Sequence, residues 1–380
     1  MFELRGRRRW LVLSVLAAGF VLAFAAAGIA IAGKPWSPLA RPIPIQVTAM
    51  PIDFDRDHPG RKDFGKLIFR RGLNLFASSH HFGGYSALAI DPSGRKILAV
   101  SDAGTWLRAD LDYDGRYLKG LGNAAIGPLL GKDGKPLSRF SRRDAEALAL
   151  KNGNVEEGEA YIAFEVDHRI ERYPFDRTRF GPPDGAVSLP DDSLMGNAGI
   201  EALAVLKAGP SRGSLLAFSQ ERRDRTNALQ GWLIGGPKPG LLTVKDIGNF
   251  TITDMTALPD GDIALLERRF TFTEGVQIRI RRLAASDIRP GAALQGEVLL
   301  QVRDNFNIDN MEAIAAHRAA DGQTILTVMS DDNFMSIQRT LLLQFALKEA
   351  GGEVLGGASP KRPGLPEPAP SSARASDALP

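Results

Sequence analysis

One short phrase recurs along the chain, and it limits the fold more than any other feature. An acidic residue followed by a small-apolar-small run stands at residues 146–149, 201–204 and 312–315. Weaker copies stand at 86–89 and 254–257, so the steps between the five copies are 60, 55, 53 and 58 residues. A repeat longer than about 50 residues is typical of a propeller, in which each blade is one repeat.

Each copy leads into a second apolar run that ends in an acid. These runs cover residues 97–102, 160–165, 215–221, 263–267 and 325–331. Turn signals such as Asp-Pro-Ser-Gly separate the paired runs, and helical periods are rare after residue 33. We therefore expect an all-β fold, a β-propeller of six blades or, as the alternative, five. Residues 43–50 and 66–75 are candidate strands that complete the closing blade, whereas a β-sandwich would leave the repeated phrase unexplained.

The N-terminus has the features of an export segment. Residues 1–9 carry four arginines, and an uncharged apolar run follows over residues 10–32. The run is long enough to cross a bilayer as a helix, and the arginines would then stay in the cytoplasm. We expect residues 1–33 to be a signal peptide or an N-terminal transmembrane helix. The rest of the chain would then be periplasmic or secreted, or anchored to the inner membrane.

The remaining divisions follow from composition. We expect a linker at residues 34–44, the propeller domain at 45–347, and a disordered tail at 348–380, where Gly, Pro, Ser and Ala dominate. The chain has 47 Lys and Arg against 44 Asp and Glu, a balance that gives no basis for nucleic-acid binding. It has no cysteine, which excludes disulfides and thiolate metal sites.

The repeated acids are expected to meet at one end of the propeller. Neighbouring strands of a blade run antiparallel, so the start of the first strand lies beside the end of the second. The acids that head the innermost strands are Glu146, Glu201, Asp254 and Glu312. The acids expected beside them are, in the same order, Glu165, Glu221, Glu267 and Asp331. Because innermost strands line the central channel, the first four carboxylates should converge at its mouth.

Carboxylates gathered in a small space need cations, because they cannot all ionise without repulsion. The candidate cations are a hard divalent metal such as calcium, which prefers oxygen ligands, or the nearby Arg142, Arg143, Arg268 and Arg269. We take all eight acids as candidate metal ligands. The four that head the strands are also the candidate catalytic residues. Arg268 and Arg143 are candidate binders of an anionic substrate, with His81 from a loop near the channel mouth. The alternative is that each acid only bonds backbone amides at a blade turn.

Several short motifs stand in order along the chain. They are Phe-Gly-Gly-Tyr-Ser-Ala-Leu at 82–88, Val-Ser-Asp at 100–102, and the phrases at 144–149, 197–202, 258–262, 266–268 and 310–315. Together they resemble the secreted family known for the esterase-like activity of phytase, the phytase-like propellers. The resemblance covers about residues 45–347. In this chain Ala follows the acid where the family usually has Gly, and the Asp-Ala-x-Asp-Asp-Pro-Ala motif of calcium-dependent propeller phytases is absent.

Two functions from different classes follow. The resemblance and the acids together predict a calcium-dependent hydrolase of phosphoesters or other esters, in which the cation polarises the ester, a carboxylate or a water acts as base or nucleophile, and arginines hold the anion. The alternative is a non-catalytic propeller that binds a small molecule, a glycan or an envelope protein at the same face. The expected partners are therefore a small anionic or ester substrate and, through an uncleaved N-terminal segment, the membrane.

Overall fold

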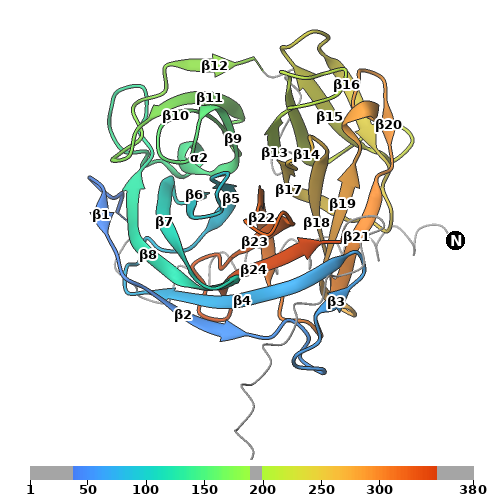
Figure 1. The fold of residues 1–380 in the computed structure, drawn as a ribbon. Coiled ribbons are helices and arrows are strands. Elements are labelled where there is room, and N and C mark those ends of the chain that lie inside the picture. The colour runs from blue at the N-terminus through green and yellow to red at the C-terminus, as the bar shows by residue number, and fades with distance from the viewer. Residues whose placement is uncertain (1–36, 189–198, 349–380) are drawn as a thin grey trace, which may run out of the picture. The chain divides into compact units, whose positions relative to one another are not determined.

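The computed structural model describes residues 37–188 and 199–348, which form five mostly antiparallel β-sheets arranged around a central axis (Figure 1). The predicted N-terminal segment and most of the predicted tail lie outside the described residues. Within the described residues, no helix is long and apolar enough to cross a membrane. The all-β propeller prediction is confirmed, and the blade count is five, the alternative that the repeat allowed.

The first three blades have four or five strands each. The first contains β1 (Ile43–Pro44), β8 (Tyr117–Pro128), β7 (Thr105–Asp114), β6 (Lys96–Ser101) and β5 (Tyr85–Ile90). The second contains β12 (Gly185–Val187), β11 (Arg169–Phe175), β10 (Gly158–Phe164) and β9 (Ala145–Gly153), and the short helix α2 (Phe140–Arg143) precedes β9. The third contains β13 (Ile200–Val205), β14 (Leu215–Arg223), β15 (Leu229–Ile234), β16 (Gly240–Val244) and β20 (Ala293–Leu294).

The last two blades complete the ring. The fourth contains β17 (Thr251–Ala257), β18 (Ile263–Thr271), β19 (Gly275–Leu283) and β21 (Glu297–Arg303), and the 3₁₀ turn η1 (Ala285–Asp287) follows β19. The fifth contains β2 (Val47–Ile52), β4 (Leu67–Ala77), β24 (Thr340–Leu347), β23 (Thr324–Asp331) and β22 (Asn310–Arg318), with β3 (Asp63–Phe64) paired to β4.

The fifth blade joins the two ends of the propeller. Its inner three strands come from the end of the described chain, whereas β2 and β4 come from its beginning. β4 pairs antiparallel with β24 from Leu67↔Leu347 to Leu75↔Thr340. The two early candidate strands therefore complete the closing blade, as expected, and they do so within the fifth repeat without adding a sixth blade.

The innermost strands β5, β9, β13, β17 and β22 lie next to one another and close a ring around the axis (Figure 1). The hydrophobic core fills the spaces between neighbouring blades. One core cluster, for example, joins Leu88 of the first blade to Ala313 and Leu342 of the fifth. The recurrent alanines on the inner strands are mostly buried, because only small side chains fit where five strands crowd around one axis.

Candidate functional site

Each innermost strand carries a β-bulge at the same place. The pairing with the second strand of the blade skips one residue, and the five skipped residues are Ser86, Glu146, Glu201, Thr253 and Glu312. A bulge bends its strand and re-aims a side chain, and bulges are frequent next to active sites. The repeated phrase therefore encodes a structural device that presents one side chain from every blade at the same end of the ring, and three of these side chains are glutamates.

Asp254 does not take the place that the repeat predicted. In the fourth blade Thr253 occupies the bulge, and Asp254 stands one residue later, where the other copies have alanine. Its Oδ2 accepts a hydrogen bond from the backbone N–H of Ile314 at 2.7 Å, on the inner strand of the fifth blade. Its Oδ1 is buried without a partner among the described residues. Burial raises the pKa of Asp254 well above its usual value.

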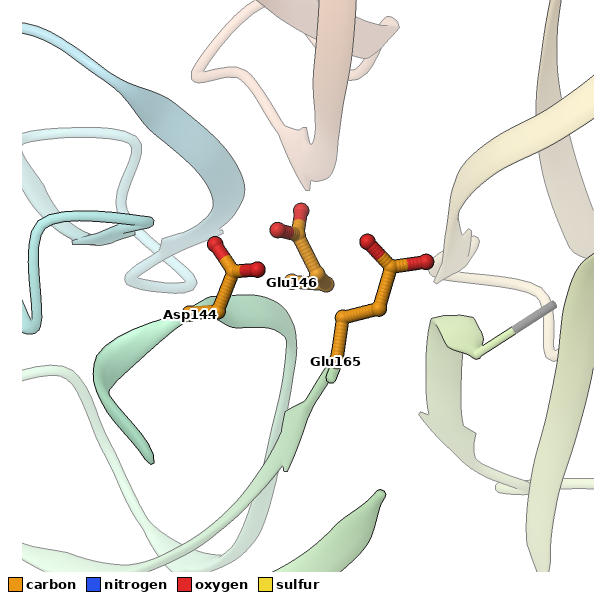
Figure 2. A group of neighbouring side chains, drawn as sticks. All are labelled: Asp144, Glu146 and Glu165. Carbon is orange, nitrogen blue, oxygen red and sulfur yellow. The ribbon is translucent and has the colours of Figure 1, made fainter. Parts of the chain in front are cut away.

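Five carboxylates form what we call the acidic cluster: Asp144, Glu146, Glu165, Glu201 and Glu312. In one group, Glu146, Glu201 and Glu312, the nearest carboxylate oxygens all lie within 4.8 Å of one another. The other group is Asp144, Glu146 and Glu165, whose nearest carboxylate oxygens also lie within 4.8 Å of one another. Figure 2 shows these three carboxyl groups turned toward one shared space. Glu146 belongs to both groups, so the cluster is continuous.

The second blade contributes three members of the acidic cluster for a local reason. Asp144 is the residue that follows α2, directly before β9, and Glu146 is two residues further on, in the bulge. Glu165 follows β10, and its backbone N–H donates to the Asp144 carbonyl at 2.9 Å, which extends the β9–β10 ladder by one more pair. The antiparallel pairing thus places the start of one strand beside the end of the next, as the sequence predicted for Glu146 and Glu165.

Four carboxylates of the acidic cluster have raised pKa values. Burial, followed by the charges of neighbouring carboxylates, raises the pKa of Glu146 and of Glu201 well above the usual value. Burial is also the main cause that raises the pKa of Asp144 to about 6 and of Glu165 to about 7. Groups this close titrate together, so the protonation of Asp144, Glu146, Glu165 and Glu201 is coupled.

Two arginines reach the acidic cluster. Arg268 Nη2 lies 3.2 Å from Glu312 Oε1 in an ion pair. Arg143 ends α2, and its charge lowers the pKa of Asp144, while burial lowers the pKa of Arg143 itself. Both residues were predicted from the sequence as binders of an anionic substrate, and the structure places both beside the carboxylates.

Glu267 is not brought to the acidic cluster. Its side chain is completely buried on β18, where Arg279 Nε and Arg281 Nε each donate to Oε2 at 2.7 Å. Arg279 Nη2 also donates to Oε1 at 2.9 Å. Two arginines from β19 therefore satisfy both oxygens, and Glu267 stabilises the fourth blade as an ion pair. The expected pairing with Asp254 is not formed, because Glu267 lies opposite Ile252 in the ladder.

The other predicted residues lie around the acidic cluster. Glu221 is exposed, on a stretch of β14 that leaves the β14–β15 ladder. Asp331 is buried and accepts from the Asn333 N–H at 2.6 Å, and burial followed by the charge of Glu312 raises its pKa well above the usual value. His81 is buried in the loop before β5, where burial lowers its pKa. Among the described residues none of these three joins either group of close carboxylates.

Two acids of this site were missing from the predicted set. Asp144 stands two residues before Glu146, and side chains two residues apart in an extended segment face the same side, so its position was a usable signal. Asp102 ends the second apolar run of the first blade. Burial, followed by the charges of Asp144 and Glu312, raises its pKa to about 7. It was the counterpart of Glu165 and could have been chosen by the same rule.

A Gly-x-Ser-x-Gly pattern at residues 209–213 could suggest a serine hydrolase. The structure places it in the β13–β14 hairpin, at the end of β13 away from Glu201. The nucleophile elbow of α/β-hydrolases requires a strand followed by a helix and an exposed serine. Ser211 is buried and lies between two strands, so this pattern is a hairpin turn.

The chain is similar to several solved structures at low sequence identity. No curated protein matches the sequence. Solved structures that resemble the chain include a protein of unknown function from Bacteroides caccae, at 12% identity and a TM-score of 0.28, covering 63% of this chain and 64% of that one. A second is the β-propeller domain of Cps50 (Swd1) from Myceliophteria thermophila, at 9% identity and a TM-score of 0.35, covering 83% and 98%. A third is a protein of unknown function from Dyadobacter fermentans, at 13% identity and a TM-score of 0.37, covering 82% and 95%.

The family comparison is more specific. The sequence model described as phytase-like, esterase-like activity of phytase, matches residues 80–334. This match spans the first blade through the β23–β24 loop, and it includes every member of the acidic cluster. The chain belongs to the phytase-like family, the family of the esterase-like activity of phytase.

Proposed function

We propose that this protein is a divalent-cation-dependent hydrolase of esters or phosphoesters, with calcium as the cation and the acidic cluster as its binding site. The observation that carries the proposal is the convergence of five carboxylates from three blades in two groups of three that share Glu146, each group with oxygens close enough to share one ion. Family membership supports the hydrolytic class. Glu146, Glu201 and Glu312 are the principal proposed ligands, with Asp144 and Glu165 completing the set.

The residues present suit a hard cation. Every atom that the acidic cluster offers is a carboxylate oxygen, the donor that calcium prefers. Glu165 Oε1 and Asp254 Oδ1 are buried oxygens without a hydrogen-bond partner among the described residues. An unsatisfied buried oxygen costs free energy, and a nearby positive charge would remove that cost. Burial and the charges of neighbouring carboxylates raise the pKa values of Asp144 and Glu165, and a bound cation would lower both pKa values.

Different residues of the protein would have different roles in hydrolysis. A bound cation would supply charge that polarises the ester oxygen. Arg268 and Arg143 are placed to hold an anionic oxygen of the substrate. Asp102 is proposed as the general base, because it lies beside the acidic cluster without belonging to either group of close carboxylates. A cation nearby would lower its pKa from about 7, leaving an ionised carboxylate that can accept a proton at neutral pH.

Exposed apolar side chains around this face favour an ester that carries an apolar group. Phe270 and Phe272 stand at the tip of the β18–β19 hairpin, just after Arg268, and Phe272 is 91% exposed. At Gly84, an added Cβ would clash both with Asp102 Oδ1 and with the Phe334 ring, so an aromatic ring lies directly beside the proposed base. A highly charged substrate such as phytate would gain nothing from these rings.

Turnover by the full-length protein tests this proposal. p-Nitrophenyl esters with short and medium acyl chains and p-nitrophenyl phosphate would be assayed with calcium and with EDTA. Glu201→Gln and Asp102→Asn should reduce the calcium-dependent rate at least about a hundredfold, the usual size of an acid–base or electrostatic contribution. Glu221→Gln is the matched control, because Glu221 is an exposed acid outside the cluster. Equal turnover by Glu201→Gln and wild type, or none by wild type, would overturn the proposal.

A non-catalytic binding role is the second candidate. The exposed Phe270, Phe272 and Phe334, which we call the apolar rim, favour this role as well. Clustered exposed aromatics are common where one protein docks on another molecule. In that case the cluster would bind calcium and order the rim, and a small molecule, glycan or envelope protein would dock there. Calcium binding without turnover of any ester would favour this second role.

We also propose that the propeller acts outside the cytoplasm. The support is the order of four arginines and an apolar run at residues 1–32. Intact mass of the protein purified from its membrane and periplasmic fractions would test this. A cytoplasmic protein of full mass would contradict the proposal, whereas cleavage or membrane retention would support it.

A further inference from the structure

A cavity with several arginines in its walls lies at the other end of the ring from the acidic cluster, between the first and fifth blades. Its volume is about 200 Å³. It is bordered by the β5–β6, β7–β8 and β22–β23 turns, whereas the bulges of β5 and β22 lie at the opposite ends of those strands. The polar side chains that line this arginine-lined cavity include Arg70, Arg95, Tyr113, Arg116, His317 and Gln344.

Among the residues that line the arginine-lined cavity, three are arginines and one is an acid. Arg95 and Arg116 form no ion pair with any residue that the structure describes. The Arg95 guanidinium lies over the Tyr113 ring, 5.2 Å from its centroid. Arg70 is buried, and its Nη2 donates to Asp321 Oδ2 at 2.6 Å, so the one acid among the lining residues is already neutralised. Two arginines therefore remain available to an anion.

His317 adds a buried polar group without a partner. Its side chain is 5% exposed, it lines the cavity, and its Nδ1 forms no hydrogen bond with the described residues. Burial lowers its pKa to about 4, so the imidazole is neutral and offers one donor and one acceptor nitrogen. A buried polar atom left unpaired costs free energy, unless a ligand or water satisfies it.

The remaining walls combine polar and apolar character. Gln344 donates from Nε2 to the Tyr113 hydroxyl at 2.9 Å, which holds the ring in place under Arg95. Ile325, Ala319 and Ala320 supply apolar surface. A space of about 200 Å³ equals about seven water molecules at liquid density, which is enough for a ring with one charged substituent.

We propose that this cavity binds a small organic anion, in which Arg95 and Arg116 hold a carboxylate or phosphate group and Tyr113, Ile325 and His317 contact the body of the molecule. This site is independent of the acidic cluster and of the proposed hydrolysis. Benzoate and phenyl phosphate have the same ring and differ in the anionic group, so together they identify which anion the cavity accepts.

Calorimetric titration of the full-length protein in EDTA tests the proposal, since EDTA prevents cation-dependent turnover of the probe. Wild type should bind at least one of the two probes with a dissociation constant in the millimolar range or tighter. Arg116→Ala and Arg95→Ala should each weaken binding about tenfold. Arg212→Ala is the matched control, because Arg212 is an exposed arginine in the β13–β14 turn, outside this cavity. Binding of neither probe, or equal affinity in all four proteins, would overturn the proposal.

His317→Gln separates a binding role from a structural one. Glutamine keeps a donor and an acceptor but changes their position. The proposal expects weaker binding of the probe by this variant, with a cooperative unfolding transition retained. An unchanged dissociation constant together with a lower unfolding temperature would show that His317 only supports the fold, and would contradict its assigned contact.

Discussion

Removal of divalent cations should make the stability of this protein depend on pH in an unusual direction. Most carboxylates in folded proteins are stabilised as anions, so stability rises as pH increases from acid. Four members of the acidic cluster have raised pKa values in the folded state: Glu146, Glu201, Asp144 at about 6 and Glu165 at about 7. The folded protein therefore binds more protons than the unfolded chain, and stability should fall as pH rises from about 4 to about 7.

The size of the effect follows from the pKa of one buried member. Asp144 has a usual value of 3.8 and a folded value of about 6, which corresponds to about 3 kcal/mol lost when it ionises without a cation. A domain of this size shifts its unfolding temperature by roughly 2–4 °C per kcal/mol, so the decrease should be roughly 6–12 °C. Other members add less than their separate values, because the groups titrate together.

Differential scanning calorimetry in EDTA, from about pH 4 to about pH 8, measures this directly. Wild type should lose stability across the range, and excess calcium should restore most of it at the upper end, since the cation binds the ionised cluster. Glu146→Gln removes a buried carboxylate whose own pKa is raised and should make the EDTA profile less steep, whereas Glu221→Gln should keep it. A wild-type profile that is flat in EDTA, or a Glu146→Gln profile as steep as that of Glu221→Gln, would refute the reasoning.

Three further predictions concern single residues. Glu267→Ala should destabilise the fold by about 3–5 kcal/mol, because it leaves Arg279 and Arg281 buried without a partner, and urea unfolding should show this with calcium affinity unchanged. Gly84→Ala should cost more than about 1 kcal/mol and lower any turnover, because φ is +65° and an added Cβ would clash with a carboxylate; stability equal to wild type would contradict this. Phe272→Ser should raise KM for medium-chain esters while leaving short-chain esters and the unfolding temperature unaffected, and a uniform change across chain lengths would argue against an apolar subsite.

The repeated phrase predicted the propeller and most of its site because one structural device produces both. Alanine follows the bulge in four of the five blades and the bulge re-aims the side chain within it, so Glu146, Glu201 and Glu312 could be found by the repeated phrase. For Asp254 the same reasoning predicted the wrong position in the strand. An acid one residue out of register looks like a copy in the sequence, yet in a strand it is directed to another environment.

Glu267 shows a different limit. Its place at the end of the second run matched Glu165, but its environment depends on Arg279 and Arg281, two residues apart on the next strand. Sequence spacing does not show which residues of the next strand will lie beside Glu267, because the pairing register of β18 and β19 is set by the whole blade. The arginine-lined cavity could not be predicted from the sequence either, because it lies between turns of the first blade and turns of the fifth, which are far apart in the sequence.

Equilibrium calcium binding is the most direct test of the central claim that the acidic cluster is a cation site. Calorimetric titration of the metal-free protein at about pH 7.5 should show saturable binding that Glu201→Gln and Glu146→Gln each weaken at least about tenfold, or about 1.4 kcal/mol. Glu221→Gln should bind as wild type does. No saturable binding by wild type, or equal affinity in all four proteins, would contradict the account.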